Sequence, residues 1–354
     1  MVDAIAFLTA LRGQQERTRL VIPPRKALDD FLSHYHLLRA VLQAPVSLIE
    51  HEYKGPEVNT SDVFPNLAED DLIEMAHLHH IVLFLTSKMA NDCCQHRPNA
   101  ETLDEGSIIL APSESFRIQR AFYRLEIFRL LFNTQGLVLN DGEPFSKEEV
   151  LSPSDQSDLF LTIFSPWEME EIQCIREFIY RVYETLPGAS DMETEFEKKH
   201  FPGAIPDEFV IDDRHRECVM SFGLEFLHRW IRVSQIPNPE ERLEEQFRMV
   251  RGQVTGLSPF SLNEAFRTPL PAEYYIYYAM EADGKTFVSD ADWNSPNLAW
   301  TWAVDGDNED ASIDLLRSCD FKLRRWGYVF WGKDRLREWD VEERVRKEYA
   351  WLNY

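Results

Sequence analysis

The spacing of apolar residues is the sequence feature that most limits how this chain can fold. Apolar residues recur every three or four positions in several long segments, which places them on one stripe of a helix with about 3.6 residues per turn. Such stripes must be covered, so helices packed around an apolar core are predicted. The first three helices run through Leu28, Phe31, Tyr35, Leu38 and Leu42 up to Pro45, from about Asp70 to Met89, and from about Ser113 to Phe132.

A helix start is predicted at Ser165-Pro166-Trp167-Glu168. Ser is a good capping residue, Pro suits the first helical position, and a Glu three residues after the cap can return a hydrogen bond to it. This helix is predicted to continue to Leu186 and to end at Pro187-Gly188. Pro has no backbone N–H to donate, and Gly has a low preference for helix. Further helices are predicted over 207–234, from Pro239 onward, over 311–326 and over 333–339.

Together these patterns predict an all-α fold, a multi-helix globular array, with at most a minor irregular or short β element near 270–305. In that region the aromatic run 274–278 fits either a strand or a buried helical segment. A length of 354 residues indicates about two domains. The Pro- and Gly-containing segment 188–206 is the predicted hinge between an N-terminal helical part, 1–190, and a C-terminal helical, Trp-rich part, 205–354. One continuous domain is the alternative.

Charge and cysteine content limit the expected partners and location. The net charge of -24, from 61 acidic and 37 basic residues, argues against nucleic acid and anionic membrane, because phosphate contacts need clustered Lys and Arg. The sequence contains no run of about twenty apolar residues, so no membrane span is predicted. The five cysteines are odd in number and have no CxxC spacing, which predicts reduced thiols and a cytoplasmic or nuclear protein. The expected partner is another protein.

Two motifs carry a resemblance to a known group of proteins. The segment FSPWEMEEI at 164–172 and the segment LRRWGYVFW at 323–331 resemble elements of a large group of proteins from filamentous fungi. In that group a PWE-x-E-x-I helix start and a terminal RxWGYVFW element recur. The resemblance covers about the last 190 residues and implies a fungal intracellular helical protein. It implies no activity and no catalytic residues.

An acidic motif gives the most concrete enzymatic hypothesis. Asp70, Asp71 and Glu74 fit the first acidic motif of class I terpene cyclases, whose carboxylates hold magnesium against a diphosphate. The second motif of those enzymes is missing, because the pair Asp212-Asp213 lacks the required Ser or Thr. We therefore favour an acid-enriched helix N-terminus and expect no metal and no cofactor. The histidines and cysteines at 77–96 match no zinc spacing.

Two groups of residues are candidates for binding another protein. The first is a basic stripe of Arg117, Arg120 and Arg124 on the helix predicted over 113–132, which would receive an acidic partner unless the arginines pair with internal carboxylates. The second is the aromatic group around Gly327 and Gly332. If exposed it would form a recognition surface, and if buried it is core, which a tight turn at the glycines favours. Its candidate binding residues are Trp326, Tyr328 and Trp331.

No Gly-rich phosphate loop, nucleophile elbow or zinc-protease motif occurs in the sequence. The sequence therefore predicts a non-enzymatic helical protein that interacts with another protein. A magnesium-dependent all-α enzyme of isoprenoid type, with Asp70, Asp71 and Glu74 as ligands, is the alternative.

Overall fold

The fold is known from a computed structural model, and most of its described residues are helical. Within them no strand occurs, which confirms the prediction of an all-α fold. The helix predicted over 28–42, the hinge predicted over 188–206 and the aromatic run 274–278 lie outside the described residues. The structure describes residues 69–98, 108–132, 153–161, 164–185, 220–251, 295–304 and 322–350.

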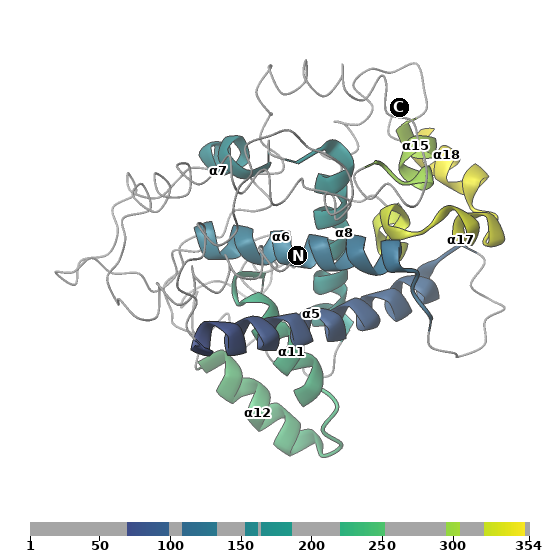
Figure 1. The fold of residues 1–354 in the computed structure, drawn as a ribbon. Coiled ribbons are helices and arrows are strands. Elements are labelled where there is room, and N and C mark those ends of the chain that lie inside the picture. Colours follow the sequence, from purple (N-terminus) through teal and green to yellow (C-terminus); the bar gives the residue numbers. More distant parts are fainter. Residues whose placement is uncertain are drawn as a thin grey trace, which may run out of the picture.

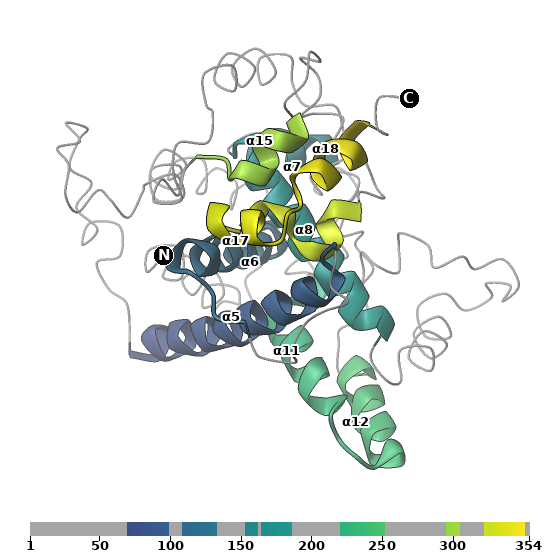
Figure 2. The same cartoon turned by 90° about the vertical axis from the view of Figure 1, so that its right-hand side faces the viewer.

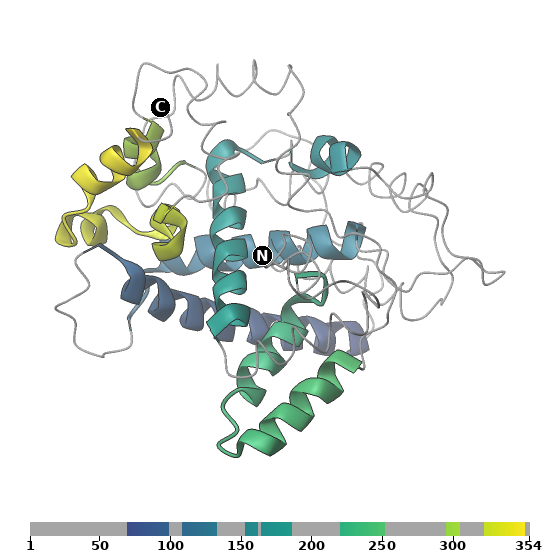
Figure 3. The ribbon, with the colours of Figure 1, turned by 180° about the vertical axis from the view of Figure 1, so that it is seen from behind.

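Three long helices form the centre of the structure. Helices α5 (Glu69–His96) and α6 (Pro112–Phe132) lie side by side, and α8 (Pro166–Thr185) crosses them, as Figures 1 and 3 show. Their apolar stripes meet in the core, where the side chains of Leu85, Phe128 and Ile175 are fully buried. The short helix α7 (Pro153–Phe160) adds Phe160, whose ring packs edge-on against Phe128.

The starts of α6 and α8 are fixed by glutamates in their first turns. In α8 the Ser165 backbone N–H donates to Glu168 Oε2 at 3.1 Å, which is the return hydrogen bond that the capping motif predicts. The Ser165 hydroxyl donates to the same oxygen at 3.0 Å rather than accepting a backbone N–H. In α6 the Ala111 N–H donates to Glu114 Oε2 at 2.9 Å. Each glutamate therefore satisfies a donor that the helix leaves unpaired.

Helices α11 (Gly223–Val233) and α12 (Pro239–Arg251) form a hairpin that packs on α5 through α11 (Figure 2). Helix α12 begins at Pro239 as predicted. The prediction of one unbroken helix over 207–234 was wrong, because Gly223 has a φ of 84° in the left-handed region, where a helix cannot continue. A Cβ at Gly223 would lie 2.5 Å from Arg129 Nε, so glycine also permits the close approach of α6.

The C-terminal elements pack against one end of α5, α6 and α8 (Figure 2). The described residues of both predicted parts contribute to one hydrophobic core, which contains Phe122 and Phe178 of the first part and Phe330 of the second. A left-handed Gly327, with a φ of 61°, joins the two 3-10 helices of this region. These elements are α15 (Leu298–Val304), η5 (Lys322–Trp326), η6 (Tyr328–Phe330), α17 (Lys333–Glu338) and α18 (Glu342–Ala350).

Candidate functional site

The arginine stripe predicted on α6 is buried. The side chains of Arg117 and Arg124 are 1% and 0% exposed, and Arg120 is 8% exposed. Helix α6 directs Arg120 and Arg124 at α8 rather than at solvent. Internal pairing, the alternative left open by the sequence, therefore holds for Arg120 and Arg124. The choice of Arg117, Arg120 and Arg124 as binding residues is corrected, since side chains enclosed by the fold cannot receive an acidic partner.

Arg120 and Arg124 form an ion cluster with Glu168 and Glu171 of α8. The Arg120 guanidinium donates to both Glu171 oxygens, at 2.5 and 3.1 Å, and Arg124 donates to Glu168 and, at 3.3 Å, to Glu171. Burial opposes ionisation, but Arg124 and Arg120 outweigh it and lower the pKa of Glu168 to about 2. Two positive and two negative charges thus cancel inside the fold and join α6 to α8.

A second buried pair joins α8 to the C-terminal elements. The Arg324 guanidinium donates through Nε and Nη2 to the two oxygens of Glu170, both at 2.8 Å, in the bidentate arrangement that favours strong pairing. The two side chains are 3% and 0% exposed. Burial opposes the charge of Arg324, but pairing with Glu170 outweighs it and raises its pKa. The glutamates of the PWEMEE motif therefore hold the fold together.

The C-terminal aromatic candidates are also core residues. The side chains of Trp326, Tyr328 and Trp331 are at most 2% exposed. The Trp331 indole N–H donates to the Trp326 carbonyl at 2.7 Å, and the Asn297 amide donates to the carbonyls of Tyr328 and Trp331 at 2.7 and 3.2 Å. The tight turn at Gly327 folds these rings inward. This burial agrees with the core reading that the tight turn favours, and it corrects the choice of Trp326, Tyr328 and Trp331 as candidate binding residues.

The acidic candidates Asp70, Asp71 and Glu74 lie in the first two turns of α5, and their side chains fall outside the described residues. Among the side chains that the structure describes, no group of three or more His, Cys, Asp and Glu residues is arranged to hold a metal ion. Cys93 is buried and burial raises the pKa of its thiol, whereas His77 is exposed, so these two do not face a common centre.

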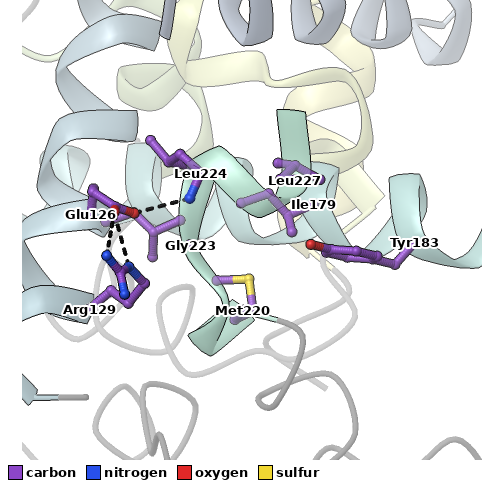
Figure 4. A pocket seen from close by; sticks show the side chains of 9 residues that line it. Glu126, Arg129, Ile179, Tyr183, Met220, Gly223, Leu224 and Leu227 are labelled. Atoms are coloured by element: carbon purple, nitrogen blue, oxygen red, sulfur yellow. Dashed lines mark hydrogen bonds and ion pairs between the residues drawn. The ribbon is translucent and has the colours of Figure 1, made fainter. Parts of the chain in front are cut away.

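A small cavity lies where α6, α8 and α11 meet (Figure 4). Its volume is about 10 Å³, which is room for about one water molecule. Glu126 accepts the backbone N–H of Leu224 at 3.2 Å and also binds Arg129, so its carboxylate caps the start of α11. The remaining lining is mainly apolar, including Ile179 and Met220. This cavity is a packing junction, because small-molecule sites need roughly 300 Å³ or more.

Three large apolar side chains are exposed among the described residues: Ile109 before α6, which is 88% exposed, and Ile73 and Leu83 of α5. The α5 pair belongs to a region that we call the α5–α11 face. Its apolar members stand out, because Ile73 is 61% exposed and Leu83 is 41% exposed. From Met75 to Lys88, α5 contains no Asp or Glu, although the whole chain carries a net charge of -24. We define the face as Ile73, His77, His80 and Leu83 of α5 with His228 and Arg232 of α11.

His228 ties the two helices of the α5–α11 face together. Its ring packs edge-on against Phe84 of α5, with 4.7 Å between the ring centres. Burial, followed by the charges of Arg232, His80 and His77, lowers the pKa of His228, while Glu225 opposes the shift. These groups therefore lie close enough to share one electrostatic environment. Sequence reasoning missed this face, because the acid-free run 75–88 is shorter than other acid-free runs of this sequence, such as 31–49 and 246–263.

Comparisons with known proteins give no guide to the site. No protein family, curated protein or solved structure matches this chain. In the part of the chain that the structure describes, every helix is too short or too polar to span a bilayer.

Proposed function

We propose that this chain is a non-enzymatic, helical protein-binding protein of the cytoplasm or nucleus, and that it binds another protein through the α5–α11 face. The observation that carries the proposal is the exposure of Ile73 and Leu83 beside His77 and His80 on one helix. Large apolar side chains that gather in the open, rimmed by polar groups, are typical of protein interaction surfaces.

The internal chemistry supports the same function. The buried charges of Glu168, Glu170 and Glu171 are matched by arginines, so these groups stabilise the fold. The cavity at α6, α8 and α11 is too small for a metabolite. The free thiols of Cys93 and Cys94 support a reducing compartment. The acidity of the chain supports a protein partner in place of nucleic acid.

Site-specific photocrosslinking in the native cells tests the proposal. A benzophenone amino acid replaces Leu83 in the full chain, and a matched control carries it in place of Arg325, which is 62% exposed on η5. Irradiation is followed by mass spectrometry of the adducts. We expect a discrete protein adduct from position 83 that the control does not give.

The proposal predicts that this adduct is lost when Ile73→Asp is added to the Leu83 crosslinking variant, because a charge in the apolar contact disfavours binding. Identical adducts from positions 83 and 325, or adducts that persist after the Ile73 change, would show that the α5–α11 face is not the binding surface.

A further inference from the structure

We infer that the partner presents a basic amphipathic helix to the α5–α11 face, with its lysines and arginines gathered towards the start of α5. This inference rests on the proposed function and adds the chemical class of the partner. It follows from the stripe that α5 exposes, from the carboxylates at one end of that stripe and from the charge of the whole chain.

The exposed stripe of α5 has the length of a helix contact. Its members recur every three or four positions, which places them along one line of the helix surface. Ile73 and Leu83 are ten residues apart, which corresponds to about 15 Å at roughly 1.5 Å per residue, or about three turns of a partner helix. No acid, lysine or arginine belongs to this stripe, whose exposed members are Ile73, Ala76, His77, His80, Leu83 and Ser87.

The start of α5 supplies the charge that the stripe itself lacks. Glu69, Asp70, Asp71 and Glu74 lie in the first two turns of the helix, which also hold Ile73. The helix dipole offsets only about half a charge at this end, so four carboxylates leave it strongly negative. A partner helix that covers Ile73 therefore gains from Lys or Arg at the same end.

The remaining charges of the face favour neither sign. Arg232 is its one formally charged cation, and Glu225 lies with Arg232 around His228. Arg232 lowers the pKa of His228 and Glu225 raises it, so both charges are close to this histidine and oppose one another there. The carboxylates at the start of α5 therefore decide which charge the partner carries and at which end.

The charge of the whole chain favours the same sign of partner. A net charge of -24 attracts a basic helix from a distance and repels an acidic one. The same repulsion disfavours a second copy of this chain as the occupant, because each copy carries that net charge. Local and long-range charge therefore agree on a basic partner.

Binding of synthetic peptides to the full-length chain tests this inference. The probe is a fluorescein-labelled 18-residue helical peptide with Leu at i, i+3, i+4 and i+7 spacing and Lys at the flanking positions of one end. Two control peptides carry Gln or Glu in place of every Lys. By fluorescence anisotropy we expect the Lys peptide to bind about tenfold more tightly than the Gln peptide, the Glu peptide to bind most weakly, and added salt to weaken the Lys peptide.

Charge-matched variants separate the start of α5 from the charge of the whole chain. The α5 triple variant combines Asp70→Asn, Asp71→Asn and Glu74→Gln. The α12 triple variant removes three exposed carboxylates from the first turns of that helix, at the tip of the hairpin away from α5 (Figures 1 and 2), by Glu240→Gln, Glu241→Gln and Glu244→Gln. The two variants have the same net charge. We expect the α5 triple variant to weaken the Lys peptide about tenfold and the α12 triple variant by about twofold or less, because salt screens distant charges.

A second pair of variants tests the apolar contact. Ile73→Ser should weaken the Lys peptide by about tenfold or more, because it removes a large apolar side chain from the contact. Ile109→Ser is the control, since Ile109 is 88% exposed but lies outside the α5–α11 face, and it should leave the affinity unchanged. Circular dichroism of each variant checks that the helices are retained.

Three outcomes would overturn the inference: equal affinity for the Lys and Gln peptides, equal losses in the two triple variants, or an unchanged affinity in Ile73→Ser. A dimer by sedimentation that Ile73→Ser dissociates would also overturn it, because a second copy would then occupy the face. If peptide binding fails while the adduct at position 83 persists in cells, the partner class is wrong and the protein-binding function stands. If that adduct is also missing, the proposed function fails as well.

Discussion

Replacement of Arg324 by Met should be among the most destabilising changes in the described core. The arginine is buried, and its Nε and Nη2 donate to the two oxygens of Glu170, both at 2.8 Å. Arg324→Met keeps the apolar packing of a long side chain but leaves the Glu170 carboxylate buried without its counter-charge. Breaking a buried pair from one side costs about 3 to 5 kcal/mol, a large part of the roughly 5 to 15 kcal/mol that typically stabilise a folded protein.

Removal of both charges together should cost much less. In the double variant Arg324→Met with Glu170→Met no ion remains buried, so the large penalty of an uncompensated charge disappears. The hydroxyl of Tyr328 lies beside Glu170 and would lose that polar neighbour. We therefore expect the double variant to be about 1 to 3 kcal/mol less stable than the wild type, which is less than either single variant.

Urea denaturation followed by circular dichroism measures the free energy of unfolding of four proteins: the wild type, Arg324→Met, Glu170→Met and the double variant. Arg325→Met is the control, because it removes the charge of a neighbouring arginine whose side chain is 62% exposed. The Arg325 Nε lies 3.9 Å from Glu177 Oε1, so this pair is on the surface. That change should alter stability by about 0 to 1 kcal/mol. Our account of the Glu170 and Arg324 pair is refuted if Arg324→Met matches this control, or if the double variant loses as much stability as the two single variants added together.

Two further predictions concern the turn at Gly327 and the ion cluster of α6 and α8. Gly327→Ala should lower the free energy of unfolding in urea by about 1 to 3 kcal/mol, because φ is 61° and a Cβ would lie 2.9 Å from the Phe330 ring. An unchanged midpoint of urea denaturation in Gly327→Ala would contradict this prediction. Because Arg124 and Arg120 lower the pKa of Glu168 from 4.5 to about 2, its stabilising contribution is present above about pH 4.5 and is lost as pH falls towards 2. The stability difference between wild type and Glu168→Gln should therefore shrink from pH 5 to pH 3, and a constant difference would argue against this pairing.

The helices followed from the sequence because their causes are local. The apolar spacing placed the start of α5 and both ends of α6 within one residue, whereas α5 continues seven residues beyond Met89 to His96. The Ser165-Pro166-Trp167-Glu168 segment also identified the start of α8, since a capping interaction involves residues only three positions apart. The break at Gly223 was missed, because the apolar spacing does not report the left-handed backbone that this glycine adopts.

The directions of the charged and aromatic side chains were decided by the tertiary structure. The sequence left open whether Arg120 and Arg124 face a partner or internal acids. In the fold they pair with Glu171 and Glu168, which lie 51 and 44 residues away along the chain. Arg324 pairs with Glu170, which is 154 residues away along the chain. The sequence therefore determined an acidic chain of amphipathic helices, whereas only packing decided which charges are neutralised inside and which remain on the α5–α11 face. The physical reason is that helix periodicity depends on neighbours along the chain, while burial and ion pairing depend on residues that only the fold brings together.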